Sequence, residues 1–96
     1  MIIVTGSIVA KEGCLAQALE LSLEHVQRSR TEPGCISHAV HLDAEHPARL
    51  FFFERWADDM ALAAHFALPA SRAFAKSLVP LLAETAQLAV FDAQPR

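Results

Sequence analysis

The stretch that decides the fold of this chain is RLFFFERWADDMALAAHF, residues 49–66. Its first half has the composition of a β-strand, in which successive side chains point to opposite faces. Apolar side chains occupy both faces, with Leu50, Phe52 and Trp56 on one and Phe51 and Phe53 on the other. A strand that is apolar on both sides needs cover on both sides of its sheet.

The second half of this stretch turns polar and then helical. Asp58 or Asp59 can cap a helix, because a short acidic side chain accepts hydrogen bonds from the first free backbone amides. The inward side of that helix is predicted to carry Leu62, His65 and Phe66.

Upstream, apolar residues recur at helical spacing between residues 14 and 30. They predict an amphipathic helix with an inner stripe of Leu15, Leu19, Leu23 and Val26. The segment that follows is predicted to be a strand with one common face: Ile36, His38, Val40 and Leu42. A polar turn over residues 43–47 connects this strand to the next, and a connection of about five residues is typical of a hairpin.

The remaining segments complete the pattern. Residues 2–9 and 88–91 are predicted strands. Ser71 is predicted to cap the last helix, which should end or kink before Pro80. The order strand, helix, strand, strand, helix pair, strand predicts an α+β, ferredoxin-like split βαβ sandwich over a single domain, residues 1–96. Its antiparallel four-stranded sheet should carry helices on one face only.

Composition bears on the partners of the chain. Hydrophobic residues make up 53% of the chain, which gives more apolar surface than helices on one face of the sheet can cover. We therefore expect a homodimer through the free sheet face. The net charge is -3 and the eight basic residues are scattered, which argues against nucleic acid. The sequence contains no run of about 18 apolar residues, so it predicts no membrane span. We expect a cytoplasmic location. Cys14 and Cys35 flank the first predicted helix and are expected to stay reduced.

Three segments carry a resemblance to a known family: EPGCISHAVHLD, FFERWADDMALAAHFALPASRAF and LAVFD. They are similar to antibiotic biosynthesis monooxygenase (ABM) domains, a group of dimeric α/β barrels that includes quinol monooxygenases. The markers are Glu32-Pro33-Gly34-Cys35, the Glu54-x-Trp56 pair and His65. The resemblance implies oxidation of a small aromatic, quinol or anthrone-type substrate by O2 with no metal or organic cofactor. The chain departs from the haem-degrading members, since it contains no Asn.

His65 is the first candidate for a catalytic base, because an imidazole titrates near neutral pH. Its predicted neighbours Leu62 and Phe66 would form part of an apolar pocket. The alternative is a buried, hydrogen-bonded structural histidine.

Glu54 and Trp56 share a strand face by their spacing of two. Glu54 is predicted to orient His65 or to accept a substrate proton, while Trp56 and Phe52 wall the pocket. The alternative is a structural salt bridge of Glu54, for which an arginine of a second subunit is a candidate, beside a core tryptophan. His38, in mid-strand, is either a pocket residue or a core histidine.

Two further functions remain open at this stage. One is an isomerase that works by proton transfer on a small oxygenated carbonyl compound. The other is a non-catalytic dimer that binds a small ligand. His38 and His41 point to opposite strand faces and do not pair as metal ligands, and no glycine-rich phosphate loop is present.

Overall fold

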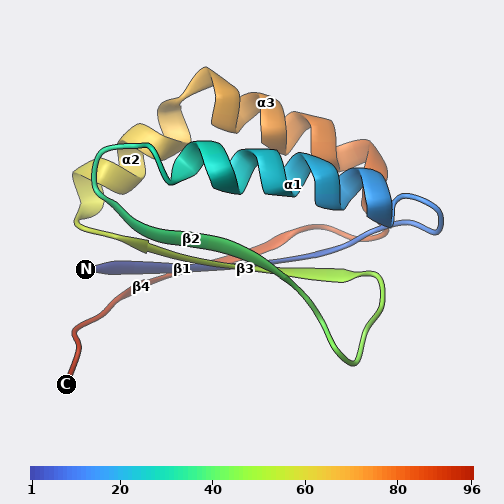
Figure 1. The fold of residues 1–96 in the computed structure, drawn as a ribbon, viewed down its shortest axis with the longest axis horizontal. Helices are drawn as coiled ribbons and strands as arrows, with labels where there is room; N and C mark the ends of the chain where they lie inside the picture. Colours follow the sequence, from blue (N-terminus) through green and yellow to red (C-terminus); the bar gives the residue numbers. More distant parts are fainter.

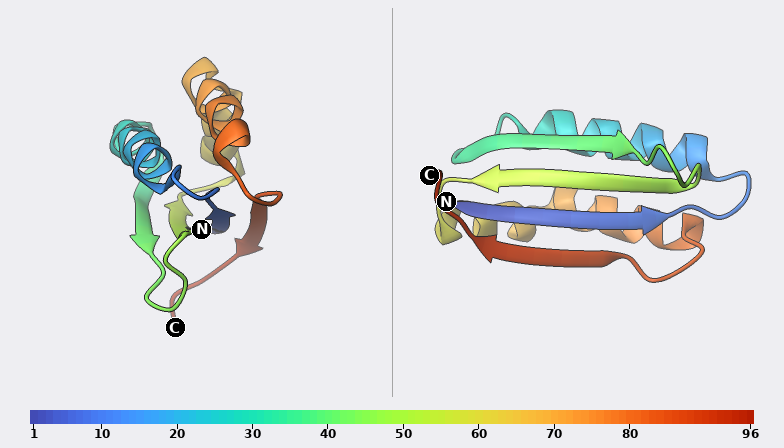
Figure 2. Two further views of the ribbon diagram at one scale, coloured as in Figure 1. Left: turned by 90° about the vertical axis from the view of Figure 1, so that its right-hand side faces the viewer. Right: turned by 90° about the horizontal axis from the view of Figure 1, so that it is seen from below.

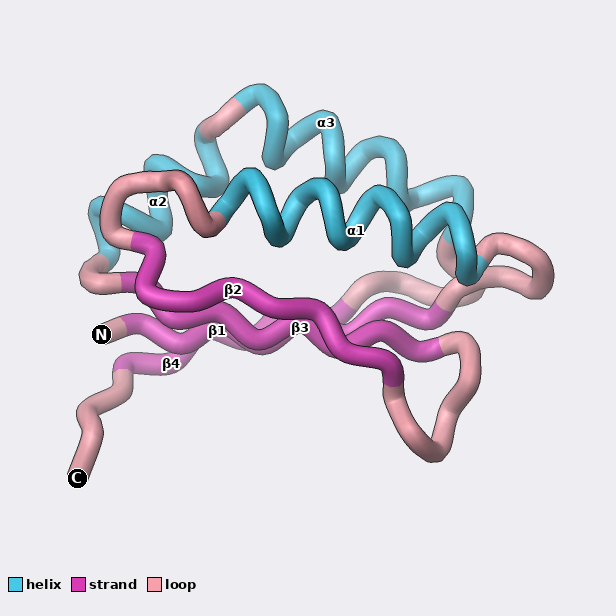
Figure 3. Tube along the Cα trace, viewed as in Figure 1, coloured by secondary structure: helices cyan, strands magenta, loops and turns pink.

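A four-stranded antiparallel sheet carries all the helices on one of its faces (Figures 1 and 3). The structure is a computed structural model that describes residues 1–96. The elements along the chain are β1 (Ile2–Val9), α1 (Leu15–Ser29), β2 (Cys35–Leu42), β3 (Arg49–Trp56), α2 (Asp59–Ala67), α3 (Pro69–Leu78), the 3₁₀ helix η1 (Val79–Leu81) and β4 (Gln87–Asp92). This order confirms the predicted ferredoxin-like α+β fold.

The strand order is β2-β3-β1-β4, with every neighbouring pair antiparallel. Seen from below, the strands lie in front and no helix covers them (Figure 2). We call this the open face; it consists of Ile3, Thr5, Ser7, Ser37, Ala39, His41, Phe51, Phe53, Arg55, Gln87, Ala89 and Phe91. None of the helices is long and apolar enough to span a bilayer.

The central strand β3 has the two apolar faces that its sequence predicts. Leu50, Phe52 and Trp56 are buried under the helices. On the open face, Phe51 is 38% exposed, and Phe91 of β4 is 51% exposed. The helices therefore cover only one of the two apolar sides.

Helix α1 approaches the sheet through small residues, which differs from the predicted stripe. Its buried residues are Ala18, Ser22, His25, Val26 and Ser29. The predicted leucine stripe is wrong in part, since Leu23 is 42% exposed. Large side chains on the sheet side would hold the helix away, whereas Ala and Ser let the backbone come close. Ser22 and Ser29 satisfy their buried hydroxyls by donating to the carbonyls of Ala18 and His25, each at 2.6 Å.

Strand β2 contains an irregularity that the alternation pattern did not predict. The register with β3 shifts between Cys35 and Ser37. Ile36 is therefore the extra residue of a bulge and is 49% exposed, so it does not share a face with His38 as predicted. The bulge restores the register that places His38 opposite Glu54.

The helix ends follow the sequence in two cases out of three. Asp58 caps α2, because its Oδ1 accepts from the amide of Ala61 at 2.8 Å. The helix α3 ends before Pro80, as predicted, and a 3₁₀ turn follows. Ser71 does not cap α3, since the helix already begins at Pro69. A proline at the first position sets the helical φ and gives up no hydrogen bond there.

Gly34 fixes how the chain turns from α1 into β2. Its φ is +82°, a conformation that side chains with a Cβ rarely adopt. A Cβ at this position would also collide with the Cβ of Ala61 on α2. The missing side chain thus lets the turn that carries Glu32 lie directly against the helix that carries His65.

Candidate functional site

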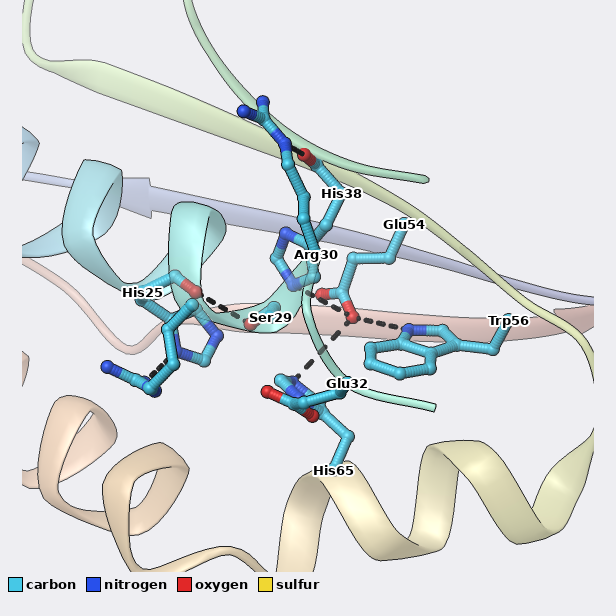
Figure 4. Close-up of polar contacts among 9 residues, drawn as sticks. His25, Ser29, Arg30, Glu32, His38, Glu54, Trp56 and His65 are labelled. Atoms are coloured by element: carbon cyan, nitrogen blue, oxygen red, sulfur yellow. Dashed lines mark hydrogen bonds and ion pairs between the residues drawn. The ribbon is translucent and has the colours of Figure 1, made fainter. Parts of the chain in front are cut away.

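Three buried histidines from three elements meet under the helices. His25 lies on α1, His38 on β2 and His65 on α2, and one ring nitrogen from each lies within 4.8 Å of the others. The carboxylate of Glu54 on β3 lies against His38 and His65 (Figure 4).

Glu54 is held as a carboxylate by its neighbours. Its Oε1 accepts from Nε1 of Trp56 at 2.9 Å and lies 3.2 Å from Nε2 of His38. Burial on its own raises the pKa of this carboxyl, but the contacts with His38, Trp56 and His65 outweigh burial and lower it. His38 and Trp56 therefore stabilise the negative charge of the Glu54 carboxylate.

His65 is oriented by a residue far away in sequence. Its Nδ1 lies 2.8 Å from Oε1 of Glu32, in the turn after α1. An ionised carboxylate only accepts hydrogen bonds, so Nδ1 carries the proton and Nε2 of the neutral ring keeps its lone pair. That nitrogen lies 4.0 Å from Oε1 of Glu54. The arrangement is that of a base held in one tautomer by a carboxylate.

His25 has a different partner. Its Nδ1 lies 2.8 Å from Nη2 of Arg28, one turn further along α1. The ring stacks on Phe74 of α3, with centroids 4.0 Å apart and an angle of 7° between the planes. Burial, followed by electrostatic interactions with His38, His65 and Arg28, lowers the pKa of His25 to about 3. The ring is therefore neutral over the physiological range.

A largely apolar cavity of about 650 Å³ opens beside these groups. Phe52 and Gly6 of the sheet line it on one side, and Phe74 and Leu78 of α3 line it on the other. His25, Glu54 and His65 supply charged or titratable groups to its wall. A small cyclic molecule fits this volume, since ligand pockets commonly range from about 300 to 1,000 Å³.

The cavity brings together some of the predicted site residues and leaves others behind its wall. His65, Glu54, Phe52 and Phe66 line it. Three others do not: Trp56, His38 and Leu62. Trp56 instead packs in a core cluster with Ile2, Val4 and Leu62. The Glu54 carboxylate lies between His38 and Trp56 and contacts both of them.

Two residues of the site were not predicted from sequence. The leucines of α1 predict a different inner stripe, one that does not include His25. The small residues Ala18, Ser22 and Ser29 at helical spacing around it were the signal that could have found it. Glu32 is part of the Glu32-Pro33-Gly34-Cys35 marker, but its separation of 33 residues from His65 leaves no local signal of their contact.

The histidine cluster has the residue types of a metal centre. A histidine that binds a metal through Nε2 directs the N–H of its other nitrogen to an acceptor. His65 meets this condition through Glu32. His25 does not, since its Nδ1 faces Arg28, whose guanidinium only donates. The three histidines as arranged therefore fit a metal poorly.

Comparisons with known proteins agree with the fold. Residues 1–77 match the sequence model of the family described as antibiotic biosynthesis monooxygenase, a span that includes every residue of the histidine cluster. An uncharacterised protein of Synechocystis sp. is 33% identical over 90 residues, which is 94% of this chain. The match covers 61% of the length of that relative.

Solved structures superpose closely. A candidate antibiotic biosynthesis monooxygenase from Deinococcus radiodurans is 25% identical, with a TM-score of 0.95 over 100% of this chain and 95% of that one. The Rv0793 protein of Mycobacterium tuberculosis shares the fold, with a TM-score of 0.92 at 20% identity over 99% and 96% of the two chains. With this fold and the match over residues 1–77, the chain belongs to the antibiotic biosynthesis monooxygenase family.

Proposed function

We propose that this protein is a monooxygenase that oxidises a small aromatic, quinol or anthrone-type substrate with O2, and that His65 is its base. The observation that carries the proposal is the Glu32–His65 contact of 2.8 Å beside a cavity with a largely apolar lining. A base oriented by a carboxylate next to an apolar space suits the removal of a proton from a weakly acidic ring compound.

The first step is the loss of a substrate proton to Nε2 of His65. The imidazolium that forms is stabilised on both sides, by Glu32 at Nδ1 and by Glu54 at 4.0 Å from Nε2. The substrate anion stays in the cavity, against the apolar side chains of Phe52, Phe66 and Phe74.

The oxidation needs no external reductant. In an anthrone-type substrate the anion passes electrons to O2 and a C–O bond forms at the ring methylene. The O–O bond then breaks, one oxygen becomes the new carbonyl, and the other leaves as water with the two hydrogens of the methylene. All electrons come from the substrate, so the balance closes without a redox cofactor.

The proposed assembly is a homodimer through the open face. Phe51 and Phe91 are exposed there, next to Ile3 and Phe53. A second copy presents the same strip of apolar residues and is the simplest cover for it. The cavity lies on the helical side of the sheet, so each protomer carries its own base.

The proposal is tested by O2 consumption with a reduced quinol and with an anthrone. In the wild type we expect uptake of one O2 per product. His65→Ala should lower kcat by about 100- to 10,000-fold, the usual worth of a positioned base. His46→Ala, in the turn between β2 and β3, is the matched control and should leave the rate unchanged.

Other outcomes point to the two rival functions. Exchange of a substrate C–H for deuterium without O2 uptake would indicate a proton-transfer isomerase with the same base. Ligand binding with neither exchange nor uptake would indicate a binding protein. Oxidation that continues unchanged in His65→Ala would remove His65 from the mechanism.

A further inference from the structure

Arg28 fixes the position of the proton on His25. A guanidinium carries five N–H donors and no acceptor, and it stays protonated in proteins. The ring nitrogen that it contacts must therefore accept, so Nδ1 of His25 holds a lone pair and Nε2 holds the hydrogen. The reverse tautomer would set two donors against each other at 2.8 Å.

The packing around His25 holds this N–H in place. The ring of His25 is stacked on Phe74. The backbone carbonyl of His25 accepts a hydrogen bond from the hydroxyl of Ser29 at 2.6 Å. The imidazole stays neutral because burial, together with the guanidinium of Arg28 and the neighbouring histidines, lowers its pKa to about 3. Both ring nitrogens of His38 are buried without a hydrogen-bond partner, whereas Nε2 of His25 is not in that condition. His25 lines the cavity.

His65 has the opposite tautomer. Glu32 accepts from its Nδ1, so Nε2 of His65 is a lone pair, whereas Nε2 of His25 is a donor. A ring nitrogen of each lies within 4.8 Å of the other. The two ring centroids lie 5.2 Å apart, which allows one oxygen atom to contact a nitrogen of each ring at about 2.8 Å, an ordinary hydrogen-bond distance. A hydroxyl between them could give its proton to His65 while it accepts from His25.

We propose that His25 is the hydrogen-bond donor that binds the substrate oxygen and stabilises its anion, and that Arg28 is the residue that positions this donor. The ligand class is a ring compound whose hydroxyl or enol oxygen loses its proton. The inference rests on the proposed function for the identity of the reaction, but the tautomer of His25 stands on the Arg28 contact alone. A donor aimed at a developing oxyanion is a recurrent source of rate enhancement.

The tautomer is measured on the free protein by ¹⁵N NMR of the imidazole side chains, with His25→Gln used for assignment. We expect the hydrogen of His25 on Nε2 and the hydrogen of His65 on Nδ1. Arg28→Lys keeps a donor-only partner and should preserve this pattern. Arg28→Glu supplies an acceptor and should move the hydrogen of His25 to Nδ1. A hydrogen on Nδ1 of His25 in the wild type would overturn the inference, whatever the enzyme oxidises.

Ligand binding tests the role of the donor. The probes are 4-nitro-1-naphthol, followed by the absorption of its anion, and its methyl ether, which cannot ionise. His25→Leu should weaken binding of the naphtholate by about 10- to 100-fold, as expected for a lost hydrogen bond to a charged oxygen. It should leave the ether unchanged, and His25→Gln, which retains an N–H, should restore part of the affinity.

Two results would contradict the role of the donor. An equal loss for both probes would mean that His25 only shapes the cavity. Stoichiometric binding of Zn²⁺ that requires all three histidines would mean that the Arg28 contact yields to a metal. If the wild type binds neither probe while the tautomers are as expected, the proposed substrate class is wrong and the positioning by Arg28 stands.

Discussion

At the scale of single residues, the site consists of ionisable groups whose partners set their protonation. Glu32 and Arg28 have opposite hydrogen-bonding capacity, and they give two neighbouring imidazoles opposite tautomers. Glu54 lies below both as a buried carboxylate with a lowered pKa. The chemical difference between His25 and His65 therefore comes from their contacts and not from the residue type.

Glu54→Gln tests how much this carboxylate stabilises the fold. A lowered pKa in the folded state contributes stability above the ordinary value of 4.5, and that contribution is lost as the pH falls through the folded pKa. We expect the variant to be less stable than the wild type by about 1–3 kcal/mol at pH 7. The difference should shrink toward zero in acid, where Glu54 is protonated. Urea unfolding at several pH values measures it, and a difference that does not depend on pH would contradict the assignment.

At the scale of elements, the contact between the turn after α1 and helix α2 positions His65, the proposed base. Gly34 allows this contact, since it has both a positive φ and no Cβ to meet Ala61. The small residues of α1 play the matching role at the sheet, where they let His25 lie over the strands. Close approach of backbones thus decides which polar groups meet.

Gly34→Ala should destabilise the fold and weaken the hold of Glu32 on His65. Gly13→Ala is a matched control, because Gly13 has φ +80° but nothing within 4 Å of an added Cβ. Both variants incur the strain of positive φ, about 1–2 kcal/mol. Only Gly34→Ala adds the collision, so its free energy of unfolding should fall further.

Replacing Ala61 by Gly in the Gly34→Ala background should recover that extra loss. The measurement is thermal or urea unfolding of the single and double variants. Equal losses in Gly34→Ala and Gly13→Ala would show that Ala61 does not limit the turn.

At the scale of the whole molecule, the open face is an apolar sheet surface that no helix covers. Its phenylalanines, Phe51, Phe53 and Phe91, form part of a sheet with helices on the other side only (Figure 2). Light scattering should therefore report a particle of about twice the 10.5 kDa chain mass.

Phe53→Glu should shift that particle toward the monomer, because a charge would be buried in the interface. Met60→Glu is the control, since Met60 is 82% exposed on α2, away from the open face. A wild type that stays monomeric at micromolar concentration would remove the dimer.

Much of the fold could be predicted from the sequence, because its signals are local. The alternation from Leu50 to Trp56 predicted the central strand and both of its apolar faces, and Asp58 and Pro80 marked helix boundaries correctly. The stripe of α1 and the bulge at Ile36 were missed, because both depend on how closely another element approaches. Hydrophobic periodicity reports which residues are apolar and carries no information on that distance.

The sequence by itself determined the order of elements, the apolar sheet and the pairing of Glu54 with Trp56, since a spacing of two on a strand fixes a shared face. Only the tertiary structure decided that Glu32 would hold His65 and that His25 would join them. These residues come from separate segments, and hydrogen bonds over such separations exist only once the chain has folded. The proton positions on the two imidazoles follow from those bonds.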